Sequence, residues 1–192
     1  MATPPADADS DLLPRIRRGD VGAFEDVFRR YHASLREFAE GYLRSSTAAE
    51  EIVQDVFLAI WARRGALRIH STLRAYLFAA VRNRALNSSR HDALVRRTLF
   101  GLVRDVEHFG VPGMGAAAPA PDDALDAGDR RASLGAAIGR LPPRSRLAVT
   151  LRWAHQLSHA EVAETMGISV KGVEKLLSIA LRHLRLDLGI DA

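Results

Sequence analysis

Cysteine is absent from the 192 residues of this chain. Disulfide bonds, thiolate metal sites and cysteine nucleophiles are therefore excluded. Aromatic residues are scarce, at 6%, whereas alanine, leucine and arginine are common, and this balance favours helices over strands. No apolar run approaches the ~20 residues that a membrane span needs, so no membrane insertion is expected. Residues 1–11 are acidic and contain proline, unlike a signal peptide, and a cytoplasmic protein is expected.

Positive charge is concentrated in two blocks, although the net charge is only +4. Residues 140–186 hold eight bases and three acids, and residues 72–97 hold six bases and one acid. The stretch between them, residues 101–130, holds six acids and two arginines. Two basic blocks on either side of an acidic spacer indicate two surfaces for a polyanion such as DNA. Solvated helix faces are the plainer interpretation of each block taken alone.

The segment 109–129 interrupts the apolar pattern of the chain. It contains the run VPGMGAAAPAPDD, in which glycine, alanine and proline predominate without helical or strand periodicity. Such a composition is typical of a flexible linker. The sequence therefore predicts an all-α protein of two small helical domains joined by a linker.

Helical spacing and cap residues organise the first half. Asp20 can cap a helix whose apolar residues recur every three or four positions, and a shorter helix is expected around residues 12–18. The sequence Thr47-Ala-Ala-Glu50 has the form of a capping box, and Ser71 or Thr72 can cap a further helix. The apolar face of the first of these helices comprises Phe24, Val27, Phe28, Tyr31, Leu35, Phe38 and Tyr42.

The strongest local pattern lies in the second half, where helices are expected at 131–140 and from Pro142 onward. Ser158-His-Ala-Glu161 is a second capping box, Gly167 can end its helix in the left-handed conformation, and Ser169 can cap the next helix. Apolar residues, with the small Ala163 at the crossing, fill the space between the two helices. This pattern predicts a helix-turn-helix whose second helix enters the DNA major groove; an ordinary helical hairpin is the alternative.

Polar side chains on that second helix are candidates for DNA contact. Lys171 and Lys175 can contact guanine or phosphate, and Glu174 can accept a hydrogen bond from cytosine. Gly172 and Ser178 lie on the same side, away from the apolar face. Arg182 and Arg185, further along, are better placed for phosphate or solvent.

Four segments and the position of the linker together resemble the extracytoplasmic-function group of sigma-70-type RNA polymerase sigma factors. LLPRIRRGDVGAFEDVFRRYHASLREFA, AAEEIVQDVFLAIWARR and STLRAYLFAAVRNRALNSSR are similar to the family's region two. LPPRSRLAVTLRWAHQLSHAEVAETMGIS is similar to its region four, and the linker lies where the family has one. The resemblance implies that residues 10–98 form region two, that 99–130 form the linker and that 131–187 form region four.

The resemblance also implies partners and sites. The partners are core RNA polymerase, through its beta-prime clamp helices and beta flap, and promoter DNA; an anti-sigma factor is a further partner that the family allows. The residues expected to contact polymerase are Glu50, Glu51, Gln54, Asp55, Leu58 and Trp61. Those expected at the minus-ten element, where unstacked bases must be captured, are Arg68, His70, Ser71, Arg82, Asn83, Arg84 and Asn87. Those expected at the minus-thirty-five element are Arg144, Arg146, Ser169, Lys171, Gly172, Glu174, Lys175, Ser178 and Arg182.

The recognition helix departs from the family's pattern at two points. Gly172 stands where many relatives have a side chain that can contact DNA, and it lowers helix propensity. Leu176 and Leu177 make the middle of the helix less polar than usual. The helix-turn-helix is unaffected by these departures, which concern only the base preference.

Two other functions compete with this interpretation. A stand-alone helix-turn-helix regulator would need a sensing or dimerising domain, and the first half contains no signature of one. An enzyme would need convergent catalytic groups, but Glu51 and Asp55 have no histidine or nucleophile at a suitable spacing. His155 and His159 are four residues apart, yet Ser158 begins a new helix between them, so neither a metal nor another cofactor is expected.

Overall fold

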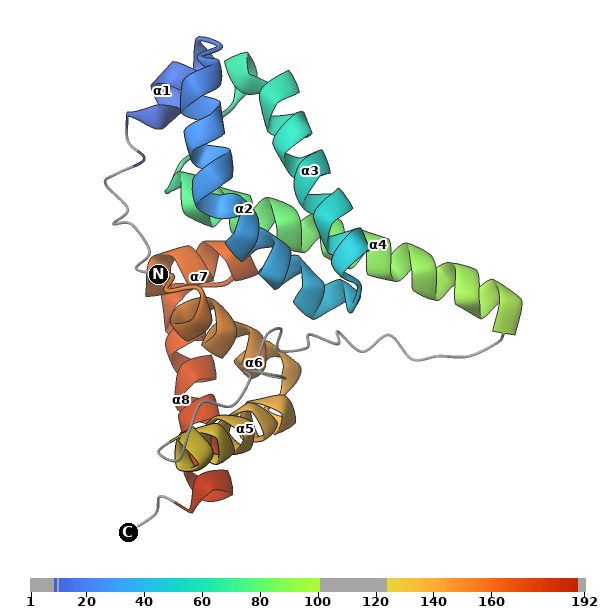
Figure 1. Ribbon diagram of the computed structural model, residues 1–192, viewed down its shortest axis with the longest axis vertical. Coiled ribbons are helices and arrows are strands. Elements are labelled where there is room, and N and C mark those ends of the chain that lie inside the picture. The colour runs from blue at the N-terminus through green and yellow to red at the C-terminus, as the bar shows by residue number, and fades with distance from the viewer. Residues whose placement is uncertain (1–8, 10, 101–123, 190–192) are drawn as a thin grey trace.

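The computed structural model describes residues 9, 11–100 and 124–189. Within these residues the regular elements are all helical (Figure 1), which confirms the predicted all-α class. None of the described helices is both long enough and apolar enough to cross a membrane.

The first domain is built from four α-helices and a short 3₁₀ turn, η2. Asp20 caps the helix that spans Val21–Leu43, because its carboxylate accepts a hydrogen bond from the backbone N–H of Ala23 at 3.0 Å. Its predicted apolar face is buried at Val27, Tyr31, Leu35 and Phe38. The elements are α1 (Leu12–Arg17), α2 (Val21–Leu43), α3 (Ser46–Ala62), η2 (Arg64–Ala66) and α4 (Leu73–Phe100). Helices α2, α3 and α4 pack against one another around this core.

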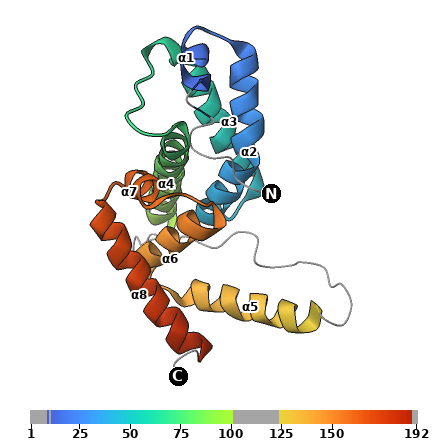
Figure 2. The same ribbon diagram turned by 90° about the vertical axis from the view of Figure 1, so that its left-hand side faces the viewer.

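The second domain contains four more α-helices and one π-helical turn, η3. Its longest helix, α8, packs against α5, α6 and α7 and runs away from the first domain (Figure 1 and Figure 2). The elements are α5 (Ala124–Arg140), α6 (Pro143–Val149), η3 (Thr150–Ala154), α7 (His159–Met166) and α8 (Val170–Leu188).

Two predictions about helix boundaries need correction. The expected capping box at Thr47 is wrong: α3 begins at Ser46, and the hydroxyl of Ser45 accepts a hydrogen bond from the N–H of Ala48 at 3.3 Å. The chain offers three hydroxyl residues in a row here, and the first of them takes the cap. The helix expected to start at residue 131 starts at Ala124. The expected linker, 99–130, thus overlaps both flanking helices, and the rest of it, 101–123, lies outside the described residues.

The two domains contact each other directly. Helix α4 packs against α7, and both views show α7 beside the start of α4 (Figure 1 and Figure 2). The turn between η3 and α7 lies at this contact, and Gln156 within it has a φ of +59°. This left-handed conformation costs a non-glycine residue of the order of 1 kcal/mol or more, so packing around the turn must hold it in place.

Candidate nucleic-acid and polymerase interfaces

Helices α7 and α8 form the predicted helix-turn-helix, and each predicted cap is present. The hydroxyl of Ser158 accepts from the N–H of Glu161 at 3.2 Å, while the Glu161 carboxylate accepts from the N–H of Ser158 at 2.8 Å. Gly167 ends α7 with a φ of +65°, in the left-handed region that favours glycine. Ser169 begins α8 by accepting from the N–H of Gly172 at 3.2 Å. The sequence therefore predicted this local geometry correctly.

Apolar side chains fix the angle between α7 and α8. Val162 and Val173 are fully buried, which places them in the space between the helices as predicted. Leu177 is also buried, whereas its neighbour Leu176 is only partly so. The two leucines that make the middle of α8 less polar are therefore there to pack against the core of the domain.

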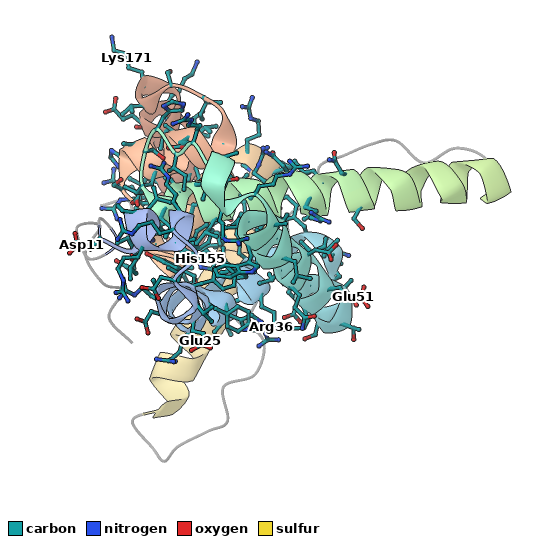
Figure 3. All side chains as sticks on the ribbon, turned by 90° about the horizontal axis from the view of Figure 1, so that it is seen from above. Asp11, Glu25, Arg36, Glu51, His155 and Lys171 are labelled. Carbon is teal, nitrogen blue, oxygen red and sulfur yellow. The ribbon has the colours of Figure 1, made fainter. Side chains whose placement is uncertain are left out.

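The outer face of α8 carries the predicted DNA-contacting residues. Lys171, Glu174, Lys175 and Ser178 are exposed, and their spacing of three and four residues puts them on one side of the helix. Figure 3 shows Lys171 at the edge of the molecule, pointing away from it. A Cβ at Gly172 would lie 3.4 Å from the Ser169 hydroxyl and 3.5 Å from the side chain of Ile168, so it would contact the turn before the helix.

The three arginines predicted for this surface differ in their environment. Arg144 and Arg182 are exposed. Arg146 is partly buried, and its guanidinium donates to the backbone oxygen of Leu141 at 3.0 Å. Burial, followed by the nearby Arg44, lowers the pKa of Arg146. Arg146 thus anchors the start of α6, and Arg144 is the more available of the two arginines in that helix.

A groove of about 460 Å³ opens between α3, the turn after it and α4. It brings together four of the residues predicted for the minus-ten element: Arg68, Asn83, Arg84 and Asn87. Its other polar or aromatic lining residues are Arg63 and Tyr76. Arginines supply positive charge, asparagines supply paired donors and acceptors, and tyrosine supplies a stacking face, so the groove suits a nucleobase and its phosphate.

Three other residues predicted for this element lie outside the groove lining. His70 and Ser71 are exposed, and Arg82 is partly buried. Arg63 was not among the predicted contacts. The spacing of Tyr76, Asn83 and Asn87 could have revealed the groove, because such intervals put these residues on one face of a helix.

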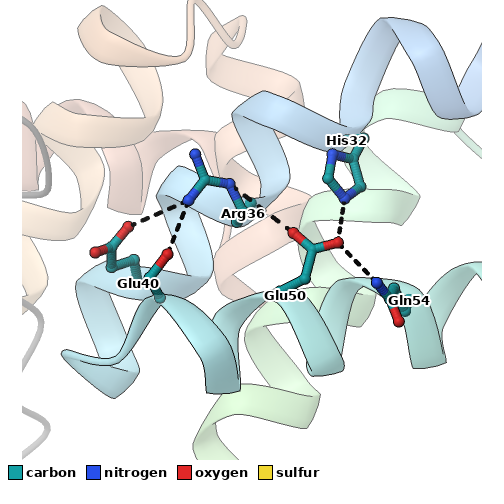
Figure 4. A network of polar contacts seen from close by, with 6 residues as sticks. His32, Arg36, Glu40, Glu50 and Gln54 are labelled. Carbon is teal, nitrogen blue, oxygen red and sulfur yellow. Dashed lines mark hydrogen bonds and ion pairs between the residues drawn. The ribbon is translucent and has the colours of Figure 1, made fainter.

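A polar network joins α2 to α3 and uses two residues predicted to bind polymerase. One oxygen of Glu50 lies 2.8 Å from His32 Nε2 and accepts from the Gln54 amide at 2.9 Å. Arg36 lies 4.0 Å from both Glu50 and Glu40 (Figure 4). Hydrogen bonds from Gln54 and then from His32 lower the pKa of Glu50. Glu50 and Gln54 therefore brace the two helices.

The other residues predicted for polymerase form a more open face on α3. Glu51 is exposed, and Figure 3 shows it at the periphery. Leu58 is 66% exposed, which is unusual for a leucine and marks a contact surface. Trp61 packs against Phe24, with ring centroids 4.9 Å apart, and beneath the guanidinium of Arg64. Asp55 forms an ion pair with Arg84 of the groove, at 2.8 Å.

Comparison with known families matches both domains. Residues 27–95 match the family described as Sigma-70 region 2, and residues 131–184 match Sigma-70, region 4. The chain is 30% identical over 187 residues to the RNA polymerase sigma factor CarQ of Myxococcus xanthus, covering 91% of this chain and 98% of CarQ. It is 29% identical over 190 residues to the RNA polymerase sigma factor CnrH of Cupriavidus metallidurans, covering 98% of each.

Two solved structures have a similar fold. One is CnrH in complex with the cytosolic domain of CnrY, with a TM-score of 0.63, 24% identity, and coverage of 96% of this chain and 99% of that one. The other is the sigma factor RpoE in complex with the anti-sigma factor NepR from Bartonella quintana, also with a TM-score of 0.63 and 24% identity, covering 88% and 98%.

Proposed function

The chain belongs to the extracytoplasmic-function group of sigma-70-type RNA polymerase sigma factors, and from this premise we propose how its surfaces divide the work of transcription initiation. The first domain binds core polymerase and the minus-ten element, and the second binds the minus-thirty-five element. The observation that carries this proposal is that two different polar surfaces stand on separate domains. One is a cationic groove and the other an exposed helix face.

The polymerase contact is assigned to the exposed face of α3, with Leu58 as its apolar centre and Glu51 as its free charge. A leucine 66% exposed beside a carboxylate fits a partner helix with apolar and basic residues. Glu50 supports this face from behind through its contact with His32, and Gln54 donates a hydrogen bond to Glu50. Trp61 keeps its end of the face rigid by packing on Phe24.

The groove beside η2 is assigned to an unpaired base of the minus-ten element. Its volume of about 460 Å³ lies within the range of pockets that hold small organic groups. Tyr76 can stack on the base, Asn83 and Asn87 can hydrogen-bond with its edge, and Arg68 can neutralise the adjacent phosphate. Arg84 can join them once it leaves Asp55.

The exposed face of α8 is assigned to duplex DNA at the minus-thirty-five element. Lys171, Glu174 and Lys175 occupy the first two turns, which approach base edges when such a helix enters the major groove. Arg144 and Arg182 are assigned to phosphate. The contact with the beta flap of RNA polymerase is also assigned to the second domain, in keeping with the family.

The alternative of a stand-alone regulator is not favoured, because the first domain matches region 2 of the sigma-70 family. Sigma factors as a family are not enzymes, and the proposal gives this protein no catalytic activity. It places the protein in the cytoplasm, with core polymerase and promoter DNA.

Permanganate footprinting of unpaired thymines tests the groove. The holoenzyme with Arg68→Ala and Asn83→Ala should bind promoter DNA but open it at least tenfold more slowly. The matched control is Arg17→Ala, which removes an exposed arginine of α1 that does not line the groove. If the double variant opens DNA as fast as the control does, the groove is not the base-binding site.

A further inference from the structure

The side chain of His155, just before α7 in the second domain, is buried against the first domain. It is 4% exposed. Its Nδ1 lies 3.0 Å from the hydroxyl of Ser34 on α2. Its ring centroid lies 5.5 Å from that of Phe38 on α2 and 5.1 Å from that of Phe78 on α4. Figure 3 shows His155 within the body of the molecule.

Charged groups of the first domain surround this contact. Arg74 of α4 is only 5% exposed and donates a hydrogen bond to the backbone oxygen of His155. Close by, Asp9 of the N-terminal segment accepts from Arg30 and from the hydroxyl of Tyr31. The pKa of Tyr31 is raised, chiefly by burial and then by Asp9, while Arg74 opposes the rise.

A second bond between the domains lies at the ends of two helices. The hydroxyl of Thr72, at the start of α4, donates to Glu161 of α7 at 2.7 Å. The other oxygen of Glu161 completes the capping box with Ser158. One carboxylate therefore stabilises the helix-turn-helix and joins it to the helix that carries the groove.

We infer that His155 and the side chains around it form a latch that holds the two domains together in the free protein and that loosens when the His155 ring takes up a proton. This inference does not rest on the proposed function, because it depends on the packing of Ser34, Phe38, Arg74 and Phe78 around His155.

Protonation of His155 opposes the closed state. Burial first, and then Arg74, lower its pKa from 6.5 to about 4. Among the described residues its Nε2 has no hydrogen-bond partner, so a proton there would be buried without an acceptor. The facing groups are the Ser34 hydroxyl on α2 and the Arg74 cation on α4, while the nearby Glu161 on α7 is engaged by Thr72 and Ser158.

The sign of the pH effect follows from this lowered pKa. His155 takes up a proton near pH 6.5 when the latch is open, and only near pH 4 when it is closed. Stability of the closed state is therefore complete above pH 6.5 and declines as the pH falls toward 4. Between pH 7.5 and 5.5 the ratio of open to closed protein should rise about tenfold.

Energy transfer between two dyes on the full chain measures opening. Because the chain has no cysteine, Thr47→Cys on α3 and His183→Cys on α8 provide two unique labelling sites, both exposed. Urea is added until the transfer efficiency falls by half, while far-UV circular dichroism reports helix content in the same samples. Measurement at the midpoint detects a change in the stability of the closed state even where nearly all of the protein is closed without urea.

The wild type should lose energy transfer before it loses helix, and at lower urea at pH 5.5 than at pH 7.5. His155→Phe keeps an aromatic ring in place but cannot be protonated, so its midpoint should differ much less between the two pH values. Ser34→Ala should lower the midpoint at both pH values while keeping the pH response, which serves as a second variant should His155→Phe fold poorly.

Three results would overturn the inference: a wild-type midpoint independent of pH, an equal pH response in His155→Phe, or loss of transfer only together with helix. A protein that fails to support transcription but still opens with acid would refute the proposed function and leave the latch standing.

Discussion

Removing one hydroxyl from the first domain should weaken its contact with the second. Thr72→Val deletes the donor to Glu161 (2.7 Å) and also the α4 cap, in which the same oxygen accepts from the N–H of Ala75 at 3.1 Å. A cap is worth about 1 kcal/mol, and that loss falls on the first domain. A hydrogen bond to a charged group contributes about 1.5–3 kcal/mol. We take about 1.5 kcal/mol, because Glu161 keeps its bond to Ser158.

Energy transfer between dyes at positions 47 and 183 reports this contact directly. A loss of about 1.5 kcal/mol corresponds to a rise of about tenfold in the ratio of open to closed protein, so Thr72→Val should lower the urea midpoint of the energy transfer. The chain also contains two tryptophans, Trp61 in α3 and Trp153 in η3. In a Trp61→Phe background, fluorescence during urea unfolding follows the second domain alone, and this Trp153 transition should stay in place because the domains have already separated.

Thr72→Ser is the matched control, because it keeps the hydroxyl and should leave the midpoint of the energy transfer nearly unchanged. Glu161→Gln should lower this midpoint and also the Trp153 midpoint, since it also weakens the capping box of α7. If Thr72→Val leaves the midpoint of the energy transfer where it is in the parent, the bond between the domains contributes nothing, and the reasoning from its geometry fails.

Three further outcomes are expected. Glu51→Lys should weaken binding to core polymerase several-fold in a pull-down without loss of helicity, whereas Glu25→Lys, an exposed acid of α2, serves as the comparison; equal affinities for the two variants would count against the α3 face. Lys175→Ala should either relax preference at one base pair, by about 1–3 kcal/mol, or lower affinity for all sequences and reduce the salt dependence, whereas Arg185→Ala should do only the latter or nothing; footprints at several salt concentrations separate these effects. Val173→Asp places a charge at a fully buried position and should unfold the second domain, so retention of a cooperative Trp153 transition would contradict the packing described.

Sequence reasoning succeeded where the physical cause is local. The caps at Ser158, Gly167 and Ser169 depend on residues three or four positions away, so single-sequence patterns are sufficient to predict them. The cap of α3 was misplaced because three hydroxyl residues compete there. The partner of Glu50 could not be foreseen either, since His32 comes from another helix.

Contacts between distant segments were beyond prediction from one sequence. The pair Asp55 and Arg84 joins a residue predicted for polymerase to one predicted for DNA, and neither local pattern indicates the other. The same holds for His155, which was weighed only as a metal ligand, although it packs on residues of α2 and α4. Such pairings depend on how whole helices pack, and helical periodicity specifies only which face is apolar.

Transcription reconstituted from purified components tests the central claim most directly. Core polymerase, this protein and genomic promoter fragments are incubated together, and transcript start sites are mapped with and without the protein. The account predicts specific starts only when the protein is present, and their loss when Lys171 and Lys175 are both replaced by alanine. Specific transcripts without the protein, or protection of duplex promoter DNA by the protein alone with no effect on polymerase, would contradict it.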